Sequence, residues 1–427
     1  MKSTNLLKEE FQSKLHDDLL RDIYIDEELL DYQRNRYIEA ISRFETIYGE
    51  CEACIFSAPG RSEIGGNHTD HQHGQVLAAA INLDAIAIVK ETMDDTVQVV
   101  SGDSPMITIS LDNLDADKNE EGTTLSLVKG VLAGIKNSSR RIGGFQTYIT
   151  SDVLIGAGLS SSAAFETIIG TIVNGLYNNM QISPVDIAII GQYAENIYFG
   201  KPCGLLDQMT SSVGNLVHID FADPDSPAVE KVEYDLSGQG YSLCIVDTKG
   251  SHADLTEDYA AIPTEMKQAA ACFGKEFMGQ VSKAELLAGL PGVREAAGDR
   301  AALRAIHFVE ENERVDIEVN SLKKNDFPTF LKTVRASGNS SFKFLQNVYS
   351  NHDVKHQNVS VALAASESIL DEDEVCRVHG GGFAGTIQAF VKNEHVEGYK
   401  NYMNLIFGEG SCSILKIRKY GGMKVLA

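Results

Sequence analysis

Residues 156–164, which read GAGLSSSAA, limit the possible folds of this chain more than any other segment. They lie between a predicted strand at 145–150 and a helical pattern that begins near Ser162. Glycines let a backbone approach a ligand closely, and the first turn of a helix exposes free N–H groups at the positive end of the helix dipole. We therefore predict a phosphate-binding loop made of Gly156, Ala157, Gly158, Leu159, Ser160, Ser161 and Ser162. The alternative is an ordinary glycine-containing loop with a serine N-cap, and because no Gly-Lys-Ser/Thr follows, it is not a Walker-type loop.

A second polar segment, residues 58–74, follows a predicted strand at 53–58. It gathers an arginine, carboxylates, an asparagine and three histidines, and we expect it to form a loop. Such a density of donors and acceptors suits recognition of a hydroxyl-rich ligand. Two alternatives remain, which are a metal site formed by His68, His71 and His73, and a solvated polar turn.

A later glycine-rich segment, residues 380–385, reads GGGFAG and formally matches the dinucleotide-binding pattern G-x-G-x-x-G. That pattern requires a helix after the glycines, whereas residues 386–391 continue as a strand pattern. We therefore predict a tight turn between two strands, which could also approach a substrate or another backbone closely.

Composition restricts the partners of the chain. Its 427 residues carry 37 Lys and Arg against 60 Asp and Glu, a formal charge of -23, which argues against nucleic acid or an anionic membrane as a partner. Seven scattered cysteines, an odd number, do not suggest a disulfide framework and favour a reducing compartment. The first residues lack the apolar core of a signal peptide, and no stretch approaches the roughly 18 apolar residues of a spanning helix, so we expect a cytoplasmic protein.

The length predicts more than one domain. Residues 1–50 carry apolar side chains at helical spacing among many charges, which predicts a helical segment packed on the first domain. A turn cluster at 223–227 marks the predicted domain change. We expect an N-terminal domain over 51–225 and a C-terminal domain over 226–427, with a cleft between them.

Together, these segments resemble the galactokinase family, which belongs to the superfamily of galactose, homoserine, mevalonate and phosphomevalonate (GHMP) kinases. The resemblance rests on the Ala-Pro-Gly-Arg loop with His68-Thr69-Asp70, the GAGLSSSAA segment, the Gly-Leu-Leu-Asp-Gln turn at 204–208 and the GGGFAG turn. It covers most of the chain after about residue 50. It implies a two-domain α+β fold with the active site in the interdomain cleft. The implied activity is transfer of a phosphoryl group from ATP, with Mg²⁺, to the anomeric hydroxyl of galactose.

The resemblance also implies roles for individual residues. Residues 156–162 would hold ATP, and Ser162 and Glu195 would hold Mg²⁺ through oxygen ligands. Asp207 would face the attacking hydroxyl as a general base or an orienting group, and Arg61 would stabilise charge during transfer. Without the resemblance, Glu195 and Asp207 would each be interpreted as a surface acid or a helix cap. The sugar would be bound by Asn67, His68, Thr69 and Asp70, with Tyr259 closing over it.

Three positions depart from the family's usual pattern. Galactokinases usually carry Glu at position 67, Asn at 63 and Tyr at 71, where this chain has Asn67, Glu63 and His71. Asn67 can bond a primary hydroxyl at C6 but brings no negative charge, so a C6 carboxylate would be repelled less. His71 and the glutamine after it also look like a pair in plant-type galacturonate kinases. Galacturonate or another galactose-like sugar is therefore the alternative substrate, and a non-catalytic sensor of sugar and ATP is a second alternative. The expected partners are a sugar and ATP, and the oligomeric state stays open.

Overall fold

The computed structural model describes residues 1–154, 158–224, 226–250 and 255–427. Its strands are β1 (Lys2–Ser3), β2 (Glu52–Gly65), β3 (Gln75–Glu91), β4 (Thr96–Ser101), β5 (Ile107–Ser110), β6 (Phe145–Ser151), β7 (Leu216–Asp220), β8 (Ala228–Val232), β9 (Tyr241–Asp247), β10 (Val375–His379), β11 (Thr386–Lys392), β12 (Cys412–Leu415) and β13 (Met423–Leu426). Its α-helices are α1 (Thr4–Gln12), α2 (Asp17–Tyr24), α3 (Leu30–Tyr48), α4 (Thr124–Asn137), α5 (Ser161–Tyr177), α6 (Pro184–Tyr193), α7 (Leu206–Val213), α8 (Thr256–Ala271), α9 (Lys283–Ala297), α10 (Asp299–Lys323), α11 (Phe327–Ser340), α12 (Asn358–Glu367) and α13 (Val396–Phe407).

The strands form two sheets. The larger has nine strands in the order β1-β2-β3-β6-β4-β5, with β13 beside β2, β7 beside β3, and β8 beside β7. The smaller has four strands in the order β10-β11-β9-β12. Only β4 and β6 pair in parallel among the described strands, so the predicted α+β class is confirmed.

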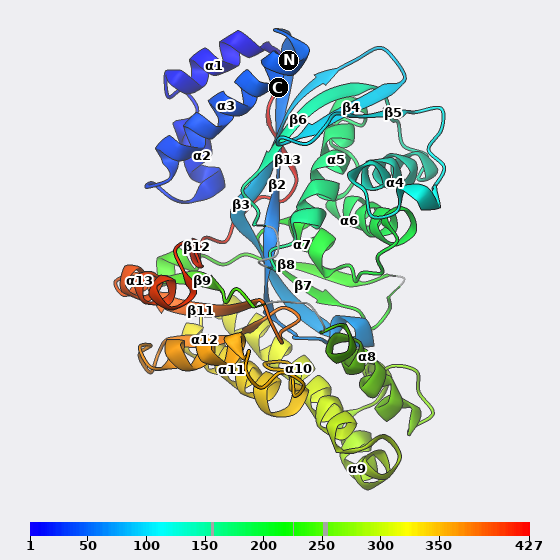
Figure 1. The fold of residues 1–427 in the computed structure, drawn as a ribbon, viewed down its shortest axis with the longest axis vertical. Coiled ribbons are helices and arrows are strands. Elements are labelled where there is room, and N and C mark those ends of the chain that lie inside the picture. The colour runs from blue at the N-terminus through cyan, green and yellow to red at the C-terminus, as the bar shows by residue number, and fades with distance from the viewer. Residues whose placement is uncertain (155–157, 225, 251–254) are drawn as a thin grey trace.

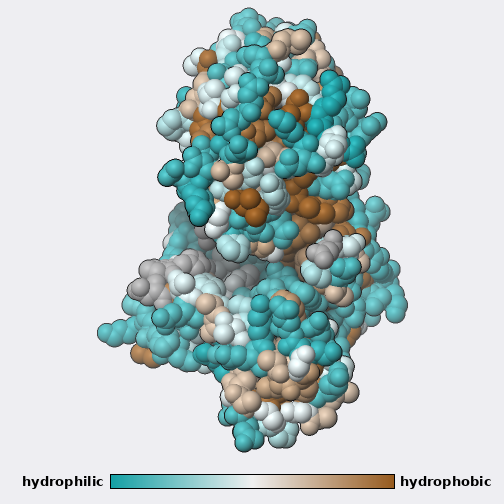
Figure 2. All heavy atoms as spheres, turned by 90° about the vertical axis from the view of Figure 1, so that its right-hand side faces the viewer, coloured by the Kyte–Doolittle hydropathy of each residue, from teal (hydrophilic) through white to brown (hydrophobic). Residues whose placement is uncertain are grey.

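The long strands β2 and β3 run through the middle of the molecule and connect its upper and lower parts (Figure 1). The two strands pair with each other, and β3 pairs with β6 near one end and with β7 near the other. Helices α4 to α7 lie on one side of this sheet and α1 to α3 on the other (Figure 1). The surface is drawn in between the upper and lower parts on the face that Figure 2 shows.

The first three helices bury apolar side chains against the larger sheet. Leu20, Tyr37 and Phe44 pack in one cluster with Ile55 of β2 and Ile88 of β3. Alternating strand residues point the other way, and there they pack against α4 and α5. The central strands are therefore covered on both faces, which fits their nearly continuous apolar sequence.

A buried carboxylate, Asp84 of β3, joins three distant parts of the chain. Arg36 of α3 donates from Nη1 to its Oδ1 over 2.7 Å, and Arg418 donates from Nη1 to its Oδ2 over 2.7 Å. Tyr24 donates to Oδ2 over 2.9 Å, and the Ser57 hydroxyl donates to the same oxygen. Burial raises the pKa of Asp84, but the charges of Arg36 and Arg418 outweigh burial and hold it below its usual value. The ionised carboxylate therefore fastens the N-terminal helices and the last strand region to the central sheet.

The predicted loop at 58–74 is wrong in its first half, because β2 continues to Gly65. Arg61 and Glu63 pair in regular register with Ala80 and Ala78 of β3, between two bulges. The backbone turns only at Gly66, which has φ +87° and where an added Cβ would lie 2.4 Å from the Gln75 carbonyl oxygen. The strand therefore carries these polar side chains on a fixed backbone.

Two strands beyond residue 226 belong to the larger sheet, since β8 pairs with β7 and β13 pairs with β2. The chain therefore enters the lower part and returns to the upper one at its end (Figure 1). The boundary at 225/226 and the three-part division stay predictions.

Two further observations concern the whole chain. All seven cysteines are free thiols. Within the part of the chain that the structure describes, no helix has both the length and the apolar character needed to cross a membrane.

Candidate active site

Arg61 of β2 and Asp207 of α7 form the centre of the site. Arg61 Nε donates to Asp207 Oδ1 over 2.7 Å, and Arg61 Nη1 donates to the carbonyl oxygen of Gly158. The Ser160 hydroxyl donates to the other oxygen of Asp207. A Cβ added at Gly60 would lie 2.8 Å from the carbonyl oxygen of Leu159. The glycine at position 60 therefore lets β2 approach the loop. The strand, the loop and α7 thus meet at one carboxylate.

The surroundings of Asp207 keep it ionised. Burial raises the pKa of Asp207, but the charge of Arg61 and hydrogen bonds from Arg61 and Ser160 outweigh burial and hold it below its usual value. The Asp207 side chain is still 35% exposed, so a ligand can reach it. An ionised carboxylate only accepts hydrogen bonds, and it can therefore orient a hydroxyl group or take its proton.

A small polar pocket of about 250 Å³ opens beside this pair. Residues from both the first half of the chain and the 380–385 turn form it, as expected for a cleft between two parts of the fold. Its lining consists of Arg61, Glu63, Gly66, His68, Asp70, His71, Leu206, Asp207, Gly380 and Gly381.

Two of the predicted sugar-binding residues, His68 and Asp70, line this pocket. No described residue donates a hydrogen bond to the Asp70 carboxylate, whose Oδ2 would lie 2.7 Å from a Cβ added at Gly204. Thr69 is fully buried, and its hydroxyl lies 2.8 Å from the carbonyl oxygen of Gly66. Asp70 therefore offers the pocket open acceptors, whereas the Thr69 hydroxyl shapes the loop.

Asn67 lies behind the pocket with no exposed surface. Its Nδ2 donates to Glu63 Oε1 over 3.1 Å and to the carbonyl oxygen of Gly380 over 2.7 Å. Its Oδ1 accepts from Asn347 Nδ2 over 2.9 Å and from the Ser341 hydroxyl over 3.2 Å. Each polar group of the side chain is thus already paired within the protein, and direct sugar contact by Asn67 stays a prediction.

Glu63 places a carboxyl group in the pocket, whereas position 67 carries an amide. Its Oε1 accepts from Arg377 Nη2 over 2.7 Å, and its side chain is 11% exposed at the pocket wall. Burial raises the pKa of Glu63 above its usual value, although the charges of Arg377 and Arg61 oppose that rise. Glu63 therefore places a carboxyl group at the pocket wall next to Asn67, and the effect of the exchange at position 67 on substrate choice stays a prediction.

Two buried side chains of helix α10 hold the backbone of the loop at residues 66–67. His307 Nε2 donates to the carbonyl oxygen of Asn67 over 2.9 Å. The N–H groups of Gly66 and Asn67 donate to Glu311 Oε1 over 3.3 and 3.4 Å. The sequence analysis gave no role to His307 or Glu311, because neither their spacing nor their types indicate contact with a loop so distant along the chain.

The predicted turn at 380–385 is confirmed between β10 and β11. His68 Nε2 lies 3.0 Å from the carbonyl oxygen of Gly381, to which it can donate. The Tyr259 hydroxyl donates to the carbonyl oxygen of Gly382 over 2.7 Å. A Cβ added at Gly381 would lie 2.8 Å from the Tyr259 ring, so this tyrosine packs directly on the turn.

Two of the three histidines of the loop approach each other, since His68 Nδ1 lies 3.3 Å from His71 Nε2. Burial, together with neighbouring His71, lowers the pKa of His68 to about 3, so His68 is neutral. The His73 ring stacks on Phe277 with centroids 3.9 Å apart. In the described ranges, the one group of three close enough to hold a metal ion combines two acids with a different histidine, at positions 371, 374 and 395.

Of the predicted phosphate loop, Gly156 and Ala157 lie outside the described residues. Helix α5 begins at Ser161, within one residue of the prediction, and Ser160 before it has φ +56°. The first N–H groups of a helix have no acceptor within it, so Ser161 and Ser162 can donate to an anion.

Glu195 lies in a π-helical segment, Ala194–Phe199, and is almost fully buried. Lys201 Nζ donates to its Oε1 over 3.0 Å, and Gln208 Nε2 donates to its Oε2 over 2.8 Å. Gln208 Nε2 also donates to Glu166 Oε2 over 3.0 Å. Glu166 follows Ser162 by one turn of α5, which places both on one face of that helix. This spacing was the sequence signal for Glu166, which the sequence analysis missed.

The oxygen atoms around Glu195 fit a hard divalent cation as ligands. Burial and the charge of Glu195 raise the pKa of Glu166 to about 9, so Glu166 is protonated at neutral pH. Glu166 Oε1 and Gln208 Oε1 are buried without a hydrogen-bond partner. Carboxylate, amide and hydroxyl oxygens are the ligands that Mg²⁺ prefers, so the residues present suit that ion.

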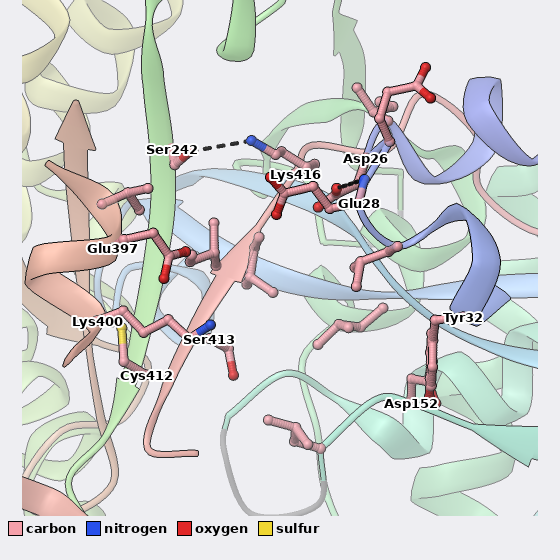
Figure 3. Close-up of a pocket in the computed structure, with 18 of the residues that line it drawn as sticks. Asp26, Glu28, Tyr32, Asp152, Ser242, Glu397, Lys400, Cys412, Ser413 and Lys416 are labelled. Atoms are coloured by element: carbon pink, nitrogen blue, oxygen red, sulfur yellow. Dashed lines mark hydrogen bonds between the residues drawn. The ribbon is translucent and has the colours of Figure 1, made fainter. Parts of the chain in front are cut away.

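A larger cavity of about 1080 Å³ lies elsewhere, between the N-terminal helices and the smaller sheet (Figure 3). Its wall includes Asp26 and Glu28 before α3, Glu397 and Lys400 of α13, and Lys416 after β12. Lys416 Nζ donates to a neighbouring serine over 3.3 Å (Figure 3). None of the predicted site residues lines this cavity, so size alone does not identify the active site.

Comparison with known proteins agrees with this geometry. Residues 42–91 match the galactokinase galactose-binding signature, and residues 126–215 match the N-terminal domain of GHMP kinases. A galactokinase from Glaesserella parasuis is 30% identical, over 83% of this chain and 90% of its own length. One from Streptomyces coelicolor is 28% identical, over 83% of this chain and 89% of its own length.

Solved structures share the fold. The structure of Lactococcus lactis galactokinase in complex with galactose superposes with a TM-score of 0.75 at 23% identity, covering 90% of this chain and 98% of that one. A mevalonate kinase from Methanococcus jannaschii reaches a TM-score of 0.61 at 15% identity, covering 86% and 98%. The predicted GHMP-kinase-like fold is therefore confirmed, and by its similarity to curated relatives over most of its length the chain belongs to the galactokinase family.

Proposed function

We propose that this protein is a sugar kinase that transfers the γ-phosphoryl group of ATP to the anomeric hydroxyl of galactose. One observation carries the proposal: the Asp207 carboxylate lies between Arg61 and Ser160, where the polar pocket meets the phosphate loop. The curated relatives are galactokinases, and the solved relative with the same fold contains galactose. The seven free thiols suit a reducing compartment, and we place the protein in the cytoplasm.

Asp207 and Arg61 are the catalytic residues in this proposal. The ionised Asp207 accepts a hydrogen bond from the anomeric hydroxyl, which aims that oxygen at the γ-phosphorus and gives the proton an acceptor. Arg61 lies against the same carboxylate, and its guanidinium stabilises the negative charge that spreads over the phosphoryl oxygens during transfer.

Residues 156–162 bind the phosphates of ATP in this proposal, with the N–H groups at the start of α5 as donors. Ser162 and Glu195 hold Mg²⁺, and the bound ion supplies positive charge that neutralises the phosphate oxygens. Gln208 fixes the Glu195 carboxylate by a hydrogen bond of 2.8 Å, so this amide orients the acid. The acidic chain thereby accepts an anionic nucleotide at one local site.

His68 and Asp70 bind the sugar in the pocket, where Asp70 can accept from two neighbouring hydroxyls. Asn67 and Thr69 hold the wall of the pocket in place through their buried hydrogen bonds. Tyr259 covers the site by packing on the 380–385 turn. A carboxylate that accepts from two hydroxyls distinguishes epimers, because the wrong epimer leaves a buried acceptor unpaired.

The test is ADP release by the purified protein with Mg-ATP and a panel of galactose, galacturonate, N-acetylgalactosamine, L-arabinose and glucose. We expect turnover on galactose, and NMR of the product should place the phosphate on C1. Galacturonate as the preferred substrate, or phosphorylation at another carbon, would overturn the proposal. Absence of turnover on every sugar, with ATP still bound, would contradict the assignment as an enzyme.

A further inference from the structure

The carboxylate of Glu63 has one oxygen engaged and one open. Oε1 accepts from both Arg377 Nη2 and Asn67 Nδ2, over 2.7 and 3.1 Å. No described residue donates to Oε2. This oxygen is not among the fully buried polar atoms that lack a partner, so part of its surface is exposed. The side chain lines the pocket, so its open oxygen is available to whatever the pocket binds.

The position of Glu63 along β2 sets where on a bound sugar it would act. Arg61, Ser62 and Glu63 pair in unbroken register with β3, so Arg61 and Glu63 share one face of the strand. Two strand residues span about 6.6 Å, which is close to the width of a hexose ring. If the reacting hydroxyl lies at Asp207 beside Arg61, Glu63 would lie at the opposite end of the sugar.

Arg377 makes this buried carboxylate stable where it stands. It is almost fully buried, and its Nη1 also donates to the carbonyl oxygen of Ile64 over 2.7 Å. The guanidinium is thus fixed by backbone contacts next to Glu63 and compensates its charge. A carboxylate held in this way keeps its open acceptor in one orientation.

We propose, on the basis of the proposed galactose kinase function, that Glu63 is the sugar-specificity residue of the pocket. Its Oε2 accepts a hydrogen bond from the sugar hydroxyl farthest from the reacting carbon, at C4 or C6. Asn67, whose own polar groups are all paired, acts as a positioning residue that holds Glu63 Oε1. Because the open oxygen of a carboxylate only accepts hydrogen bonds, an ionised carboxylate at C6 offers it no donor, which selects neutral hexoses over uronates.

The contact can be tested by combining changes in the enzyme and in the substrate. The substrates are galactose and its 2-deoxy, 4-deoxy and 6-deoxy forms, and the enzymes are wild type and Glu63→Gln. We expect deoxygenation at C4 or C6 to lower kcat/KM of the wild type about 10- to 100-fold, chiefly through KM. In Glu63→Gln the same deoxygenation should cost several-fold less than in the wild type, because a neutral amide replaces the carboxylate and bonds the hydroxyl more weakly.

An exchange variant controls for folding, since Glu63→Gln could disturb the pair with Arg377. Glu63→Asn combined with Asn67→Glu keeps both residue types and leaves the new carboxylate near Arg377. Its melting temperature should stay near that of the wild type, and its preference among the deoxy sugars should change. Dissociation constants for each sugar, measured by calorimetry without ATP, provide a readout independent of turnover.

The outcomes separate this inference from the proposed function. If the wild type does not phosphorylate galactose, the proposed function fails whatever Glu63 does. If the wild type is active but the effects of Glu63→Gln and of deoxygenation multiply at C4 and C6, the contact does not exist. Coupling confined to the 2-hydroxyl, beside the reacting carbon, would also overturn it. A Glu63→Gln variant that still discriminates against galacturonate as strongly as the wild type would contradict the argument that a uronate offers Glu63 no donor.

Discussion

Asp84 and Asp207 are both carboxylates held by arginine, and they differ in what remains open. Asp84 is fully buried, and two arginines, a serine and a tyrosine occupy its two oxygens. Asp207 has one arginine and one serine, and about a third of its side chain faces the pocket. Arginine lowers the pKa in both cases against the opposite effect of burial. The charge is therefore similar, and only the unfilled coordination at Asp207 leaves room for a substrate.

The difference shows how this chain separates stability from chemistry. A carboxylate whose partners come from α2, α3, β2 and the segment before β13 contributes to holding those elements together. A carboxylate whose second side faces a cavity has the preorganisation that catalysis needs, without the saturation that would block it. Loss of each charge should therefore produce a different phenotype.

Replacement of Asp207 should give the largest functional effect. In Asp207→Asn the amide cannot take a proton, so kcat on galactose should fall by about 10²- to 10⁴-fold. The melting temperature and the affinity for ATP should change little. Steady-state ADP release and calorimetry with ATP measure both quantities. Asp112→Asn, at an exposed position, is the matched control and should behave as wild type. Near wild-type turnover of Asp207→Asn would exclude Asp207 as the catalytic carboxylate.

Replacement of Asp84 should instead destabilise the protein. Asp84→Asn leaves the buried Arg418 without its counter-charge and leaves Arg36 with only Asp152, 3.2 Å away, which costs about 3–5 kcal/mol in the free energy of unfolding. Tyr24→Phe removes one hydrogen bond to the same carboxylate, together with the contact to the Tyr37 hydroxyl, and should cost about 1.5–3 kcal/mol. Urea denaturation gives both values. Equal losses in the two variants would show that the arginine pairs contribute little, and the contrast with Asp207 would fail.

Sequence could indicate Asp207 and not Asp84, and the reason is the distance between partners along the chain. Asp207 stands in a motif whose neighbours have a chemical meaning. Asp84 stands alone in an apolar strand, and its arginines are 48 and 334 residues away. Local spacing carries no information about such a pairing. The start of α5 and the turn between β10 and β11 were predictable for the opposite reason, because the periodicity of apolar residues is local.

Glu63 illustrates a second limit of the sequence analysis. The exchange of residue types at positions 63 and 67 was visible, but the two were treated separately, so contact between their side chains was not predicted. Contact between them depends on the bulge between Glu63 and Gly65 and on the left-handed turn at Gly66. Those backbone features bring Asn67 Nδ2 to 3.1 Å from Glu63 Oε1, and no helical or strand period predicts that distance.

Glu166 sharpens the comparison, because its buried carboxyl group accepts a hydrogen bond from Gln208 and has no arginine partner among the described residues. Its folded-state pKa of about 9 lies well above the unfolded value of about 4.3. Between these values the folded state binds more protons, so stability falls as pH rises, by at most about 1.4 kcal/mol per pH unit. Glu166→Gln lacks this dependence and should gain stability relative to wild type between pH 5 and 9. Urea denaturation without divalent ions checks this. A constant difference between the two proteins across that range would mean that Glu166 is ionised in the folded state.

Glu195 is intermediate between the two, because its ion-pair partner is an exposed lysine that can move away from the carboxylate. Lys201 Nζ lies 3.0 Å from Glu195 Oε1, yet the lysine side chain is 63% exposed, so the pair is held weakly. If Glu195 binds Mg²⁺, the metal competes with this ammonium group.

Lys201→Met keeps the length of the side chain without its charge, and should lower the half-saturating Mg²⁺ concentration by up to about fivefold, corresponding to about 1 kcal/mol. Mn²⁺ binding in the presence of ADP, followed by electron paramagnetic resonance, should tighten in parallel, and kcat at saturating Mg²⁺ should not change. A higher Mg²⁺ requirement in Lys201→Met would mean that Lys201 assists the nucleotide site. Glu195 would then belong with Asp84, as a carboxylate whose arrangement is complete without a ligand.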